Sequence, residues 1–367
     1  MRYAAITGWG KCVPPAVLTN ADLETIVDTT DDWITTRTGI KERRISHVEA
    51  SDLGTVAARR ALAAAGRSAG EVDLVMLAST SPDTVIPQAA SLIQEKIGAD
   101  HAGALDVNSG CAGWVYGLAL ATQMVRAGAM ERVLVIGAEK LHFWIDYTDR
   151  TTCVLFGDGA GAVLLEPSDQ PAGVLTFDLG SDGSAADILA VKSSGSAADL
   201  LDAFEERSFG IRMDGPEVFR RAVTVMGESA IRVVKEAGLE LSDVSLLIPH
   251  QANMRIIDAT TRRLKLDPSQ VYINIASYGN TSTATIPIAL TEALEEGKVM
   301  PGSHLVFASF GAGLSWAAAL VRWGDRVTPI GESDAQLPPN HKSALELLEP
   351  NLRFFGRTDV PSHFPAE

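Results

Sequence analysis

The chain has 367 residues, of which 46% are hydrophobic and 21% charged, and its formal net charge is −15 at pH 7. This composition is typical of a globular protein with a large core, and the acidic balance argues against nucleic acid or an anionic membrane as a partner. No apolar run reaches the ~18 residues of a membrane span, and the N-terminal apolar stretch is a poor signal peptide. The 3 cysteines are scattered, so neither a disulfide framework nor a zinc site is predicted, and we expect a cytoplasmic protein.

Short β-branched runs alternate with longer helical stretches along the chain. Strands are predicted over 72–80, 132–139 and 153–166, and helices that end in glycine over 52–66 and 111–128. Alternation of this kind predicts a mostly parallel, buried sheet that is covered by helices. The fold class is therefore α/β.

The second part of the chain repeats the first at a nearly constant offset. The strand pattern at 72–77 recurs at 244–249, and the pattern at 132–139 recurs at 304–311. In each half, a helix lies between these two strands; it follows Cys111 in the first half and Asn280 in the second. Three matches in the same order indicate an internal duplication.

The duplication divides the chain into an N-terminal half over 1–172, a C-terminal half over 173–324 and an extension over 325–367, whose role the sequence does not indicate. It makes Cys111 and Asn280 equivalent positions, each at the start of a helix in its own half. Both side chains should therefore meet near a pseudo-twofold axis.

Three residues carry the candidate chemistry. Cys111 lies among small residues at a helix start, where free N–H groups stabilise a thiolate, so a lowered pKa and a nucleophilic role are predicted; a packing cysteine is the alternative. His250 follows the predicted strand at 244–249, at the edge where α/β sheets bind ligands. Asn280 either caps a helix or donates, together with a neutral histidine, to a developing negative oxygen. The glycines of FGAG at 310–313 indicate a tight turn or half of an oxyanion hole.

Six stretches of the chain form a set that occurs in one known enzyme family. They are DVNSGCAGW, VLFGDGAGA, PHQANMRII, YGNTSTATIP, SFGAGLSWAAALVRW and the N-terminal TTDDWITTRTGIKERR. The set resembles β-ketoacyl-[acyl-carrier-protein] synthase III of the thiolase superfamily, and the similarity extends to Trp323. It implies a thiolase-like fold, with the two halves in a five-layer αβαβα arrangement.

The resemblance implies an acyltransferase that condenses an acyl-CoA with malonyl-[acyl-carrier-protein], with loss of CO2, to start fatty acid synthesis. The products would be 3-oxoacyl-[acyl-carrier-protein] and coenzyme A. No metal or redox cofactor is implied. The implied partners are the acyl-CoA, the malonyl-carrier protein and a second copy of the chain. Neither nucleic acid nor a membrane is expected as a partner.

The matching positions take their implied roles from the resemblance. Cys111 resembles the acyl-accepting nucleophile, and His250 and Asn280 resemble the two donors that drive decarboxylation. The backbone N–H groups of Cys111 and Ala312 would form the oxyanion hole. Residues that resemble the coenzyme A site are Trp33, Arg37, Arg150, Gly215, Phe219 and Asn253.

The acyl pocket and the carrier site are implied in the same way. Ile86 resembles the tip of a loop that enters the neighbour's acyl pocket in a homodimer, and Phe310 would line that pocket; the small size of Ile86 predicts room for more than an acetyl group. Arg255, Arg262 and Arg263 share roughly one face of a predicted helix. We interpret this face as the docking surface for an acidic carrier protein, with an ordinary solvated face as the alternative.

Two departures and three rival functions stand beside this interpretation. The extension has no counterpart in the family pattern, and the bulky pair Phe143 and Trp144 is expected to reshape the coenzyme A entrance. A pathway-specific synthase or acyltransferase of secondary metabolism would use the same three residues. A non-catalytic partner subunit would be expected to lack the nucleophile, and a cysteine hydrolase would not explain the coenzyme A motif or the duplication.

Overall fold

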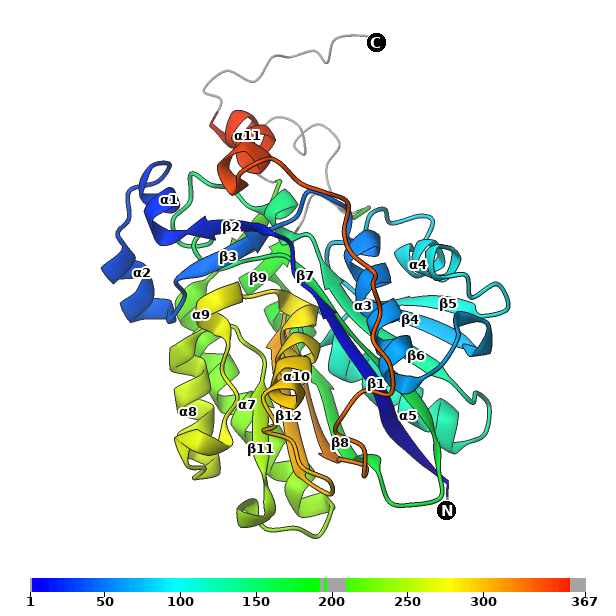
Figure 1. Cartoon of the computed structure of the whole chain (residues 1–367). Helices are drawn as coiled ribbons and strands as arrows, with labels where there is room; N and C mark the ends of the chain where they lie inside the picture. The colour runs from blue at the N-terminus through cyan, green and yellow to red at the C-terminus, as the bar shows by residue number, and fades with distance from the viewer. Residues whose placement is uncertain (1, 192–194, 197–208, 357–367) are drawn as a thin grey trace.

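The computed structural model describes residues 2–191, 195–196 and 209–356 and contains one large mixed sheet with helices on its faces (Figure 1). The end of the predicted extension, 357–367, lies outside the described residues. The nine strands of the large sheet are β1 (Tyr3–Cys12), β4 (Leu74–Ala78), β5 (Gly103–Val107), β6 (Val133–Glu139), β7 (Gly159–Ser168), β8 (Gly173–Ser181), β11 (Leu246–Pro249), β12 (His304–Gly311) and β13 (Ser315–Arg322). Two short ladders pair β2 (Ala16–Thr19) with β3 (Glu42–Ile45) and β9 (Leu189–Val191) with β10 (Ile211–Met213).

The large sheet consists of two half-sheets with the same internal order. The full order is β11-β12-β13-β8-β1-β7-β6-β4-β5. In each half a parallel pair, β4 with β6 or β11 with β12, is followed by two antiparallel pairs. The halves join where Ala4 lies opposite Gly173. Next to β11, Val271 pairs in parallel with Leu247. In the N-terminal half-sheet the equivalent place, next to β4, is occupied by β5.

The prediction of a mostly parallel sheet is wrong, because the sheet is mixed. Antiparallel strands such as β7 are buried almost throughout, from Gly159 to Glu166. Helices cover both of their faces, so their apolar pattern is as continuous as that of a parallel strand.

The helices form three layers around the two half-sheets. Helices α5 and α10 pack against strands of both half-sheets, α3 and α4 cover the N-terminal half-sheet, and α7 with α8 covers the C-terminal one (Figure 1). Bounds of the helices are α1 (Asn20–Glu24), α2 (Asp31–Thr38), α3 (Ala50–Ala65), α4 (Ala89–Ile97), α5 (Gly113–Arg126), α7 (Gly215–Glu236), α8 (Met254–Leu264), α9 (Ile275–Tyr278), α10 (Thr285–Glu295) and α11 (Ala344–Phe355). The predicted five-layer αβαβα arrangement is thus present.

Small residues allow the outer helix α3 to lie close to strand β1. A Cβ atom at Gly10 would lie 2.6 Å from the carbonyl oxygen of Ala57, and one at Gly8 would collide with the carbonyl of Ala61. Only glycine permits this approach of helix to strand. The contact fixes the position of the N-terminal half-sheet relative to its outer helices.

The strand predicted over 153–166 begins only at Gly159. The preceding residues form turns instead: the backbone N–H of Cys153 donates to Asp149 O at 3.0 Å, that of Leu155 donates to Thr152 O at 3.0 Å, and the carbonyl of Val154 accepts from the buried Arg43 side chain at 3.0 Å. Backbone groups that are paired in this way are not available to a strand ladder.

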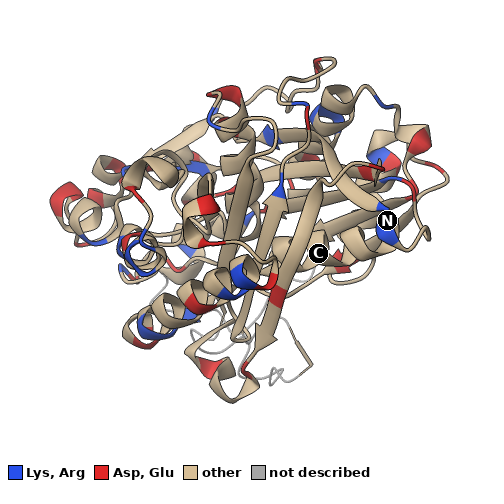
Figure 2. Ribbon diagram, turned by 90° about the horizontal axis from the view of Figure 1, so that it is seen from below, with Lys and Arg blue, Asp and Glu red and all other residues tan. Residues whose placement is uncertain are grey.

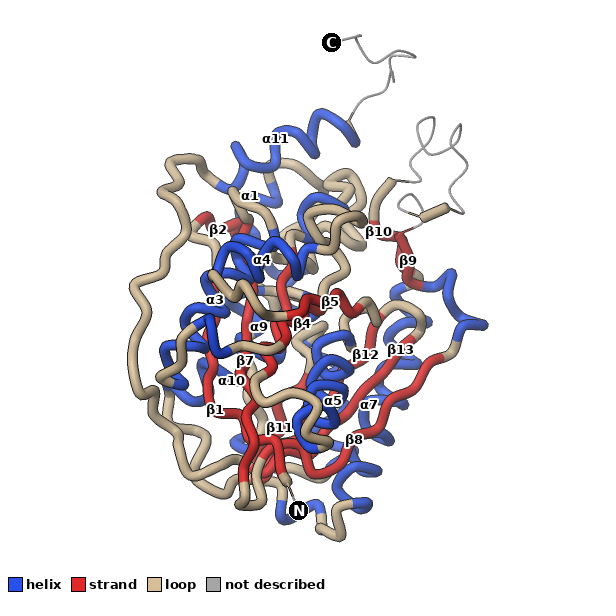
Figure 3. The backbone as a smooth tube through the Cα atoms, turned by 90° about the vertical axis from the view of Figure 1, so that its right-hand side faces the viewer, coloured by secondary structure: helices blue, strands red, loops and turns tan. Residues whose placement is uncertain are grey.

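The extension leaves β13 at the bottom of Figure 1 and ascends along α3 to α11. Figure 3 shows the same loop along one side of the molecule. Among the residues that the structure describes, no helix is both long enough and apolar enough to span a membrane.

Candidate active site

Cys111 lies directly before the central helix α5, where two cavities meet. The helix begins at Gly113 with Ala112 as its N-cap, so Cys111 stands one residue outside the cap. Its Sγ accepts a hydrogen bond from Ser282 Oγ at 3.3 Å. Burial raises the pKa of the Cys111 thiol to about 12, and the Ser282 hydrogen bond opposes this shift. The predicted lowering of the Cys111 pKa is therefore wrong, because desolvation outweighs the helix terminus.

His250 follows β11 and is held on two sides. Its backbone N–H donates to Ala308 O on β12 at 2.8 Å, and its Nδ1 lies 2.7 Å from Thr285 Oγ1. Burial lowers the pKa of His250 to about 3, so the imidazole is neutral at neutral pH. The Thr285 hydroxyl has one proton and two acceptors within reach, His250 Nδ1 and Ser282 O at 3.0 Å. In the tautomer in which it donates to Nδ1, the proton of the neutral ring resides on Nε2, and the ring donates into the cavity.

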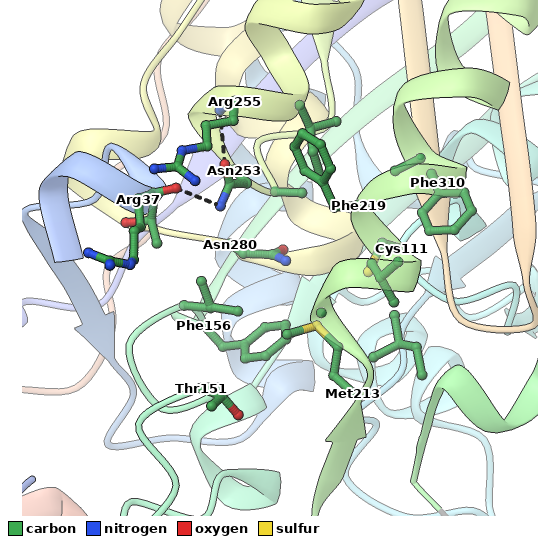
Figure 4. Close-up of a pocket in the computed structure, with 18 of the residues that line it drawn as sticks. Arg37, Cys111, Thr151, Phe156, Met213, Phe219, Asn253, Arg255, Asn280 and Phe310 are labelled. Carbon is green, nitrogen blue, oxygen red and sulfur yellow. Dashed lines mark hydrogen bonds between the residues drawn. The ribbon is translucent and has the colours of Figure 1, made fainter. Parts of the chain in front are cut away.

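Asn280 reaches the same cavity from the loop before α10. Its backbone N–H donates to Leu155 O at 2.8 Å, and its Oδ1 accepts from the backbone N–H of Ser282 at 2.8 Å. Asn280 is not the N-cap of α10, which begins at Thr285 after Ala284, but its Oδ1 binds the backbone N–H of the first residue of the 3₁₀ turn η6 (Ser282–Ala284) that leads into this helix. Because Oδ1 is already engaged, the side-chain NH2 group is left as a donor; in Figure 4 the side chain extends toward Cys111.

The FGAG turn is pressed against the peptide of Cys111. A Cβ atom at Gly110 would lie 2.6 Å from the backbone nitrogen of Ala312, and one at Gly311 would collide with the backbone nitrogen of Cys111. Ser309 Oγ donates to Cys111 O at 2.9 Å. These glycines are needed for close contact between the two segments, and not only for a tight turn. The N–H groups of Cys111 and Ala312 are consequently brought close to each other.

A cavity of about 660 Å³ connects Cys111, His250 and Asn280 with the protein surface (Figure 4). The predicted coenzyme A residues that line it are Trp33, Arg37, Gly215, Phe219 and Asn253. Arg150 does not line it, but its guanidinium lies 5.1 Å from the ring centre of Trp33, which Arg37 also approaches at 4.6 Å. Two cations therefore stack on one indole at the entrance. Asn253 caps α8 and donates to Arg37 O at 3.1 Å.

A second, smaller cavity, here called the rear cavity, also reaches Cys111. Its volume is about 70 Å³, and its walls include Leu141, Trp144, Phe156 and Ile211. The lining is almost entirely apolar, which suits an aliphatic chain attached to the sulfur.

Comparison with known proteins assigns the family. Residues 105–183 match the family described as 3-oxoacyl-[acyl-carrier-protein (ACP)] synthase III, and residues 234–323 match the description of its C-terminal part. Beta-ketoacyl-[acyl-carrier-protein] synthase III 2 of Vibrio cholerae is 50% identical over 346 residues, which cover 94% of this chain and 95% of that protein. The chain belongs to the β-ketoacyl-[acyl-carrier-protein] synthase III family.

Other relatives agree with this assignment. Beta-ketoacyl-[acyl-carrier-protein] synthase III of Roseiflexus castenholzii is 48% identical over 325 residues, 88% of this chain and 98% of that protein. The crystal structure of 3-oxoacyl-[acyl-carrier-protein] synthase III from Aquifex aeolicus VF5 superposes with a TM-score of 0.82 at 43% identity, covering 87% of this chain and all of the other. The Vibrio match is longer than the two predicted halves together, so it includes part of the extension.

Membership confirms the predicted thiolase-like fold and the predicted enzyme class. The chain is a condensing acyltransferase, and the reaction of the synthase III family joins an acyl-CoA to malonyl-acyl carrier protein at the start of fatty acid synthesis. The alternatives of a cysteine hydrolase and a non-catalytic partner subunit are thereby set aside.

The two predicted acyl-pocket residues of this synthase III chain occupy different places. Phe310 is buried and lines the large cavity beside Cys111. Ile86 is 88% exposed and lines neither cavity of its own chain. A role for Ile86 in an acyl pocket therefore requires a second subunit.

The three arginines predicted to dock the carrier protein lie along α8, but their surroundings differ. Arg255 lines the mouth of the large cavity, and Arg262 is exposed. Arg263 forms an ion pair with Glu228 of α7 at 2.6 Å. Figure 2 shows basic and acidic positions interspersed over the elements, so the positive charge of this surface rests mainly on Arg255 and Arg262.

Three polar groups of the site were not predicted from the sequence. Ser282 contacts Cys111, Thr285 contacts His250, and the fully buried carboxylate of Glu139 accepts hydrogen bonds from Thr283 Oγ1 at 2.8 Å and Ser81 Oγ at 2.5 Å. The hydroxyl-rich stretch TSTAT at 281–285 was the only signal for the first two. It does not indicate which hydroxyl faces which partner.

Proposed function

We propose that Cys111, His250 and Asn280 divide the condensation into two half-reactions. In the first, Cys111 Sγ attacks the thioester carbonyl of the acyl-CoA, a new carbon–sulfur bond forms, and the bond to coenzyme A breaks. The thiol proton leaves with coenzyme A, which departs as its free thiol. The N–H groups of Cys111 and Ala312 stabilise the negative oxygen of the tetrahedral intermediate.

In the second half-reaction, malonyl-acyl carrier protein enters the emptied cavity and loses CO2. The electron pair left by CO2 forms an enolate, whose oxygen accepts hydrogen bonds from neutral His250 and from the Asn280 amide. The enolate carbon attacks the acyl group, and Cys111 departs and regains a proton. No metal or redox cofactor enters these steps, and that absence stays a prediction.

The observation that carries this proposal is the convergence of three distant segments on one cavity. The nucleophile lies before α5, the histidine follows β11, and the asparagine precedes α10, yet all three line the same 660 Å³ space. The low pKa of His250 keeps that residue neutral, and a neutral imidazole donates to an enolate oxygen through the ring nitrogen that carries its proton. Cys111 accepts the acyl group, and the other two act on the malonyl thioester.

Separate measurement of the two half-reactions tests this division of labour. His250→Ala and Asn280→Ala should still transfer an acyl group from acyl-CoA to Cys111, because that step uses the sulfur and backbone N–H groups. Decarboxylation of malonyl-acyl carrier protein should slow by ~10²–10³ for each, the usual effect of losing one such donor. Equal loss of both half-reactions in either variant would contradict the proposal.

The entrance residues support binding of the nucleotide end of coenzyme A. Trp33 and the two guanidinium groups that stack on it, those of Arg37 and Arg150, form a planar cluster on which the adenine can stack, and the two arginines supply charge for the phosphates. Asn253, Gly215 and Phe219 would flank the pantetheine arm along the cavity. A cytoplasmic location also stays a prediction.

A homodimer is supported by an exposed sheet edge. Strand β5 ends the large sheet, and the side chain of Leu105 on it is 39% exposed. Val85 and Ile86 are 74% and 88% exposed, and they lie in the segment that Gln88 joins to β5 by donating to Ala104 O at 3.1 Å. An apolar edge strand is normally covered, and pairing with the same strand of a second copy would cover it. Light scattering should give twice the chain mass, and Leu105→Asp should shift it toward the monomer; a monomeric wild type would contradict the homodimer.

A further inference from the structure

The C-terminal extension is fastened along the full length of α3. After β13 it first contacts the end of that helix, where the backbone N–H of Gly331 donates to Ala63 O at 3.1 Å. Near the beginning of the helix, His47 Nε2 donates to the carbonyl of Pro338 at 2.8 Å. Figures 1 and 3 show the chain following this path. The extension thus crosses the N-terminal half and arrives at α11 in a defined place.

Helix α11 is seated on the short 3₁₀ turn η2 (Leu141–Trp144). Its Leu348 side chain is fully buried in an apolar cluster that also contains Leu141. On the next turn, Asn351 Nδ2 donates to His142 O at 2.6 Å and lies within 3.4 Å of two further carbonyl oxygens of the same segment. One side chain of the extension therefore holds the backbone of η2.

Aromatic rings join the end of α11 to the same turn. The ring centres of Trp144 and Phe209 lie 5.1 Å apart, as do those of Phe209 and Phe354, and Phe354 is 5.0 Å from Phe355. Phe143 completes the set at 4.9 Å from Trp144. These separations are in the range of favourable ring contacts. Trp144 thus contacts Phe209, which in turn contacts Phe354 of the extension, so the support reaches Trp144 through Phe209.

Both supported residues line the rear cavity behind the nucleophile. Leu141 and Trp144 belong to its wall, as does Cys111. The cavity measures about 70 Å³, which corresponds to roughly five to seven water-sized groups at ~10–15 Å³ each. It accommodates a short acyl chain on the sulfur.

We propose that the C-terminal extension limits the length of the acyl chain that Cys111 accepts, by holding Leu141 and Trp144 at the wall of the rear cavity. The inference rests on the proposed role of Cys111 as acyl acceptor. A wall that is held by Asn351 and by the aromatic rings does not recede to admit a longer chain. Each methylene group that does not fit costs about tenfold or more in rate.

The test measures acyl loading of Cys111 from acetyl-, butyryl-, hexanoyl- and octanoyl-CoA by intact-protein mass spectrometry. The double variant Asn351→Ala with Phe354→Ala removes the hydrogen bonds to η2 and the ring that lies 5.1 Å from Phe209, and neither residue lines the rear cavity. Arg353→Ala is the matched control, because this residue lies on the same helix, is exposed, and pairs only with Glu349 among the ion pairs of the described residues. Thermal unfolding verifies that each variant is folded.

The wild type and the control should load octanoyl at least about tenfold more slowly than butyryl. In the double variant the two rates should approach each other, while acetyl loading persists. If the double variant does not fold, the two single variants are measured in its place. An unchanged ratio of the butyryl to the octanoyl loading rate in a folded variant would overturn this inference. It would leave the proposed function standing, because acetyl on Cys111 would still support it. A wild type that loads no acyl group on Cys111 would overturn both.

Discussion

The hydrogen bond from Ser282 to Cys111 offers the sharpest test of how the proposed nucleophile is activated. Ser282→Ala removes the hydroxyl that lies 3.3 Å from Cys111 Sγ. A hydrogen bond to a charged group contributes ~1.5–3 kcal/mol, and one pKa unit corresponds to ~1.4 kcal/mol. The pKa of Cys111, about 12 with the bond in place, should therefore rise by about one to two units when the bond is lost.

This rise in pKa reduces the fraction of thiolate by about ten- to a hundredfold. A thiolate of higher pKa is also a better nucleophile, with a Brønsted coefficient of ~0.4–0.5, which offsets nearly half of the loss on a logarithmic scale. We expect acyl loading and iodoacetamide alkylation of Cys111 to slow together by about 3- to 15-fold at fixed pH below 9.

The matched control for this change is Ser309→Ala. Ser309 is equally buried, but its Oγ donates to the carbonyl oxygen of Cys111 and not to the sulfur. Its alkylation rate should stay close to that of the wild type. Alkylation rates that are the same in Ser282→Ala and the wild type, or that fall equally in both variants, would refute a role for the Ser282 hydroxyl in stabilising the thiolate.

Three further outcomes are expected. Trp33→Ala should raise KM for acyl-CoA by about 5- to 150-fold, since stacking of a base on an aromatic ring contributes ~1–3 kcal/mol. An acyl-pantetheine substrate that lacks the nucleotide should react as before, and equal loss with both substrates would argue against an adenine site. The double variant Arg262→Glu with Arg263→Glu should raise KM for malonyl-acyl carrier protein and make that KM less dependent on salt. Arg262 should carry most of the effect, because Arg263 is paired with Glu228. Normal condensation across a salt series would place the carrier protein elsewhere. The pKa of His250 falls from 6.5 to about 3 on folding, so the residue stays neutral in the folded protein and gains a proton on unfolding below pH 6.5. Its contribution to the free energy of unfolding is therefore complete above pH 6.5 and is lower by roughly 2 kcal/mol at pH 5. Chemical denaturation should show a shallower acid dependence of stability for His250→Asn than for the wild type, and identical slopes would contradict this.

The meeting of Cys111 with Asn280 could be predicted because the duplication places them at equivalent points of two halves. The approach of His250 could be predicted because it follows a buried strand, and the carboxyl ends of such strands carry ligands. These inferences depend only on chain topology. They did not require any knowledge of side-chain contacts.

The immediate partners of these residues could not be predicted. Ser282 adopts a left-handed backbone with φ 48° inside a 3₁₀ turn, and that conformation, not the residue type, directs its hydroxyl to the sulfur. The pKa of Cys111 depends on how completely the surrounding elements exclude water. Asn351 and Phe354 belong to a segment far along the chain from η2, so their contacts follow from the path of the extension and leave no local pattern.

The most direct test of the central claim is the site at which an acyl group is held. The protein is incubated with acetyl-CoA and no malonyl substrate, digested, and analysed by mass spectrometry. The proposal predicts one added acetyl group on the peptide that contains Cys111, and none on Cys111→Ala. An acetyl group on Cys12 or Cys153, or acetylation that persists in Cys111→Ala, would contradict it.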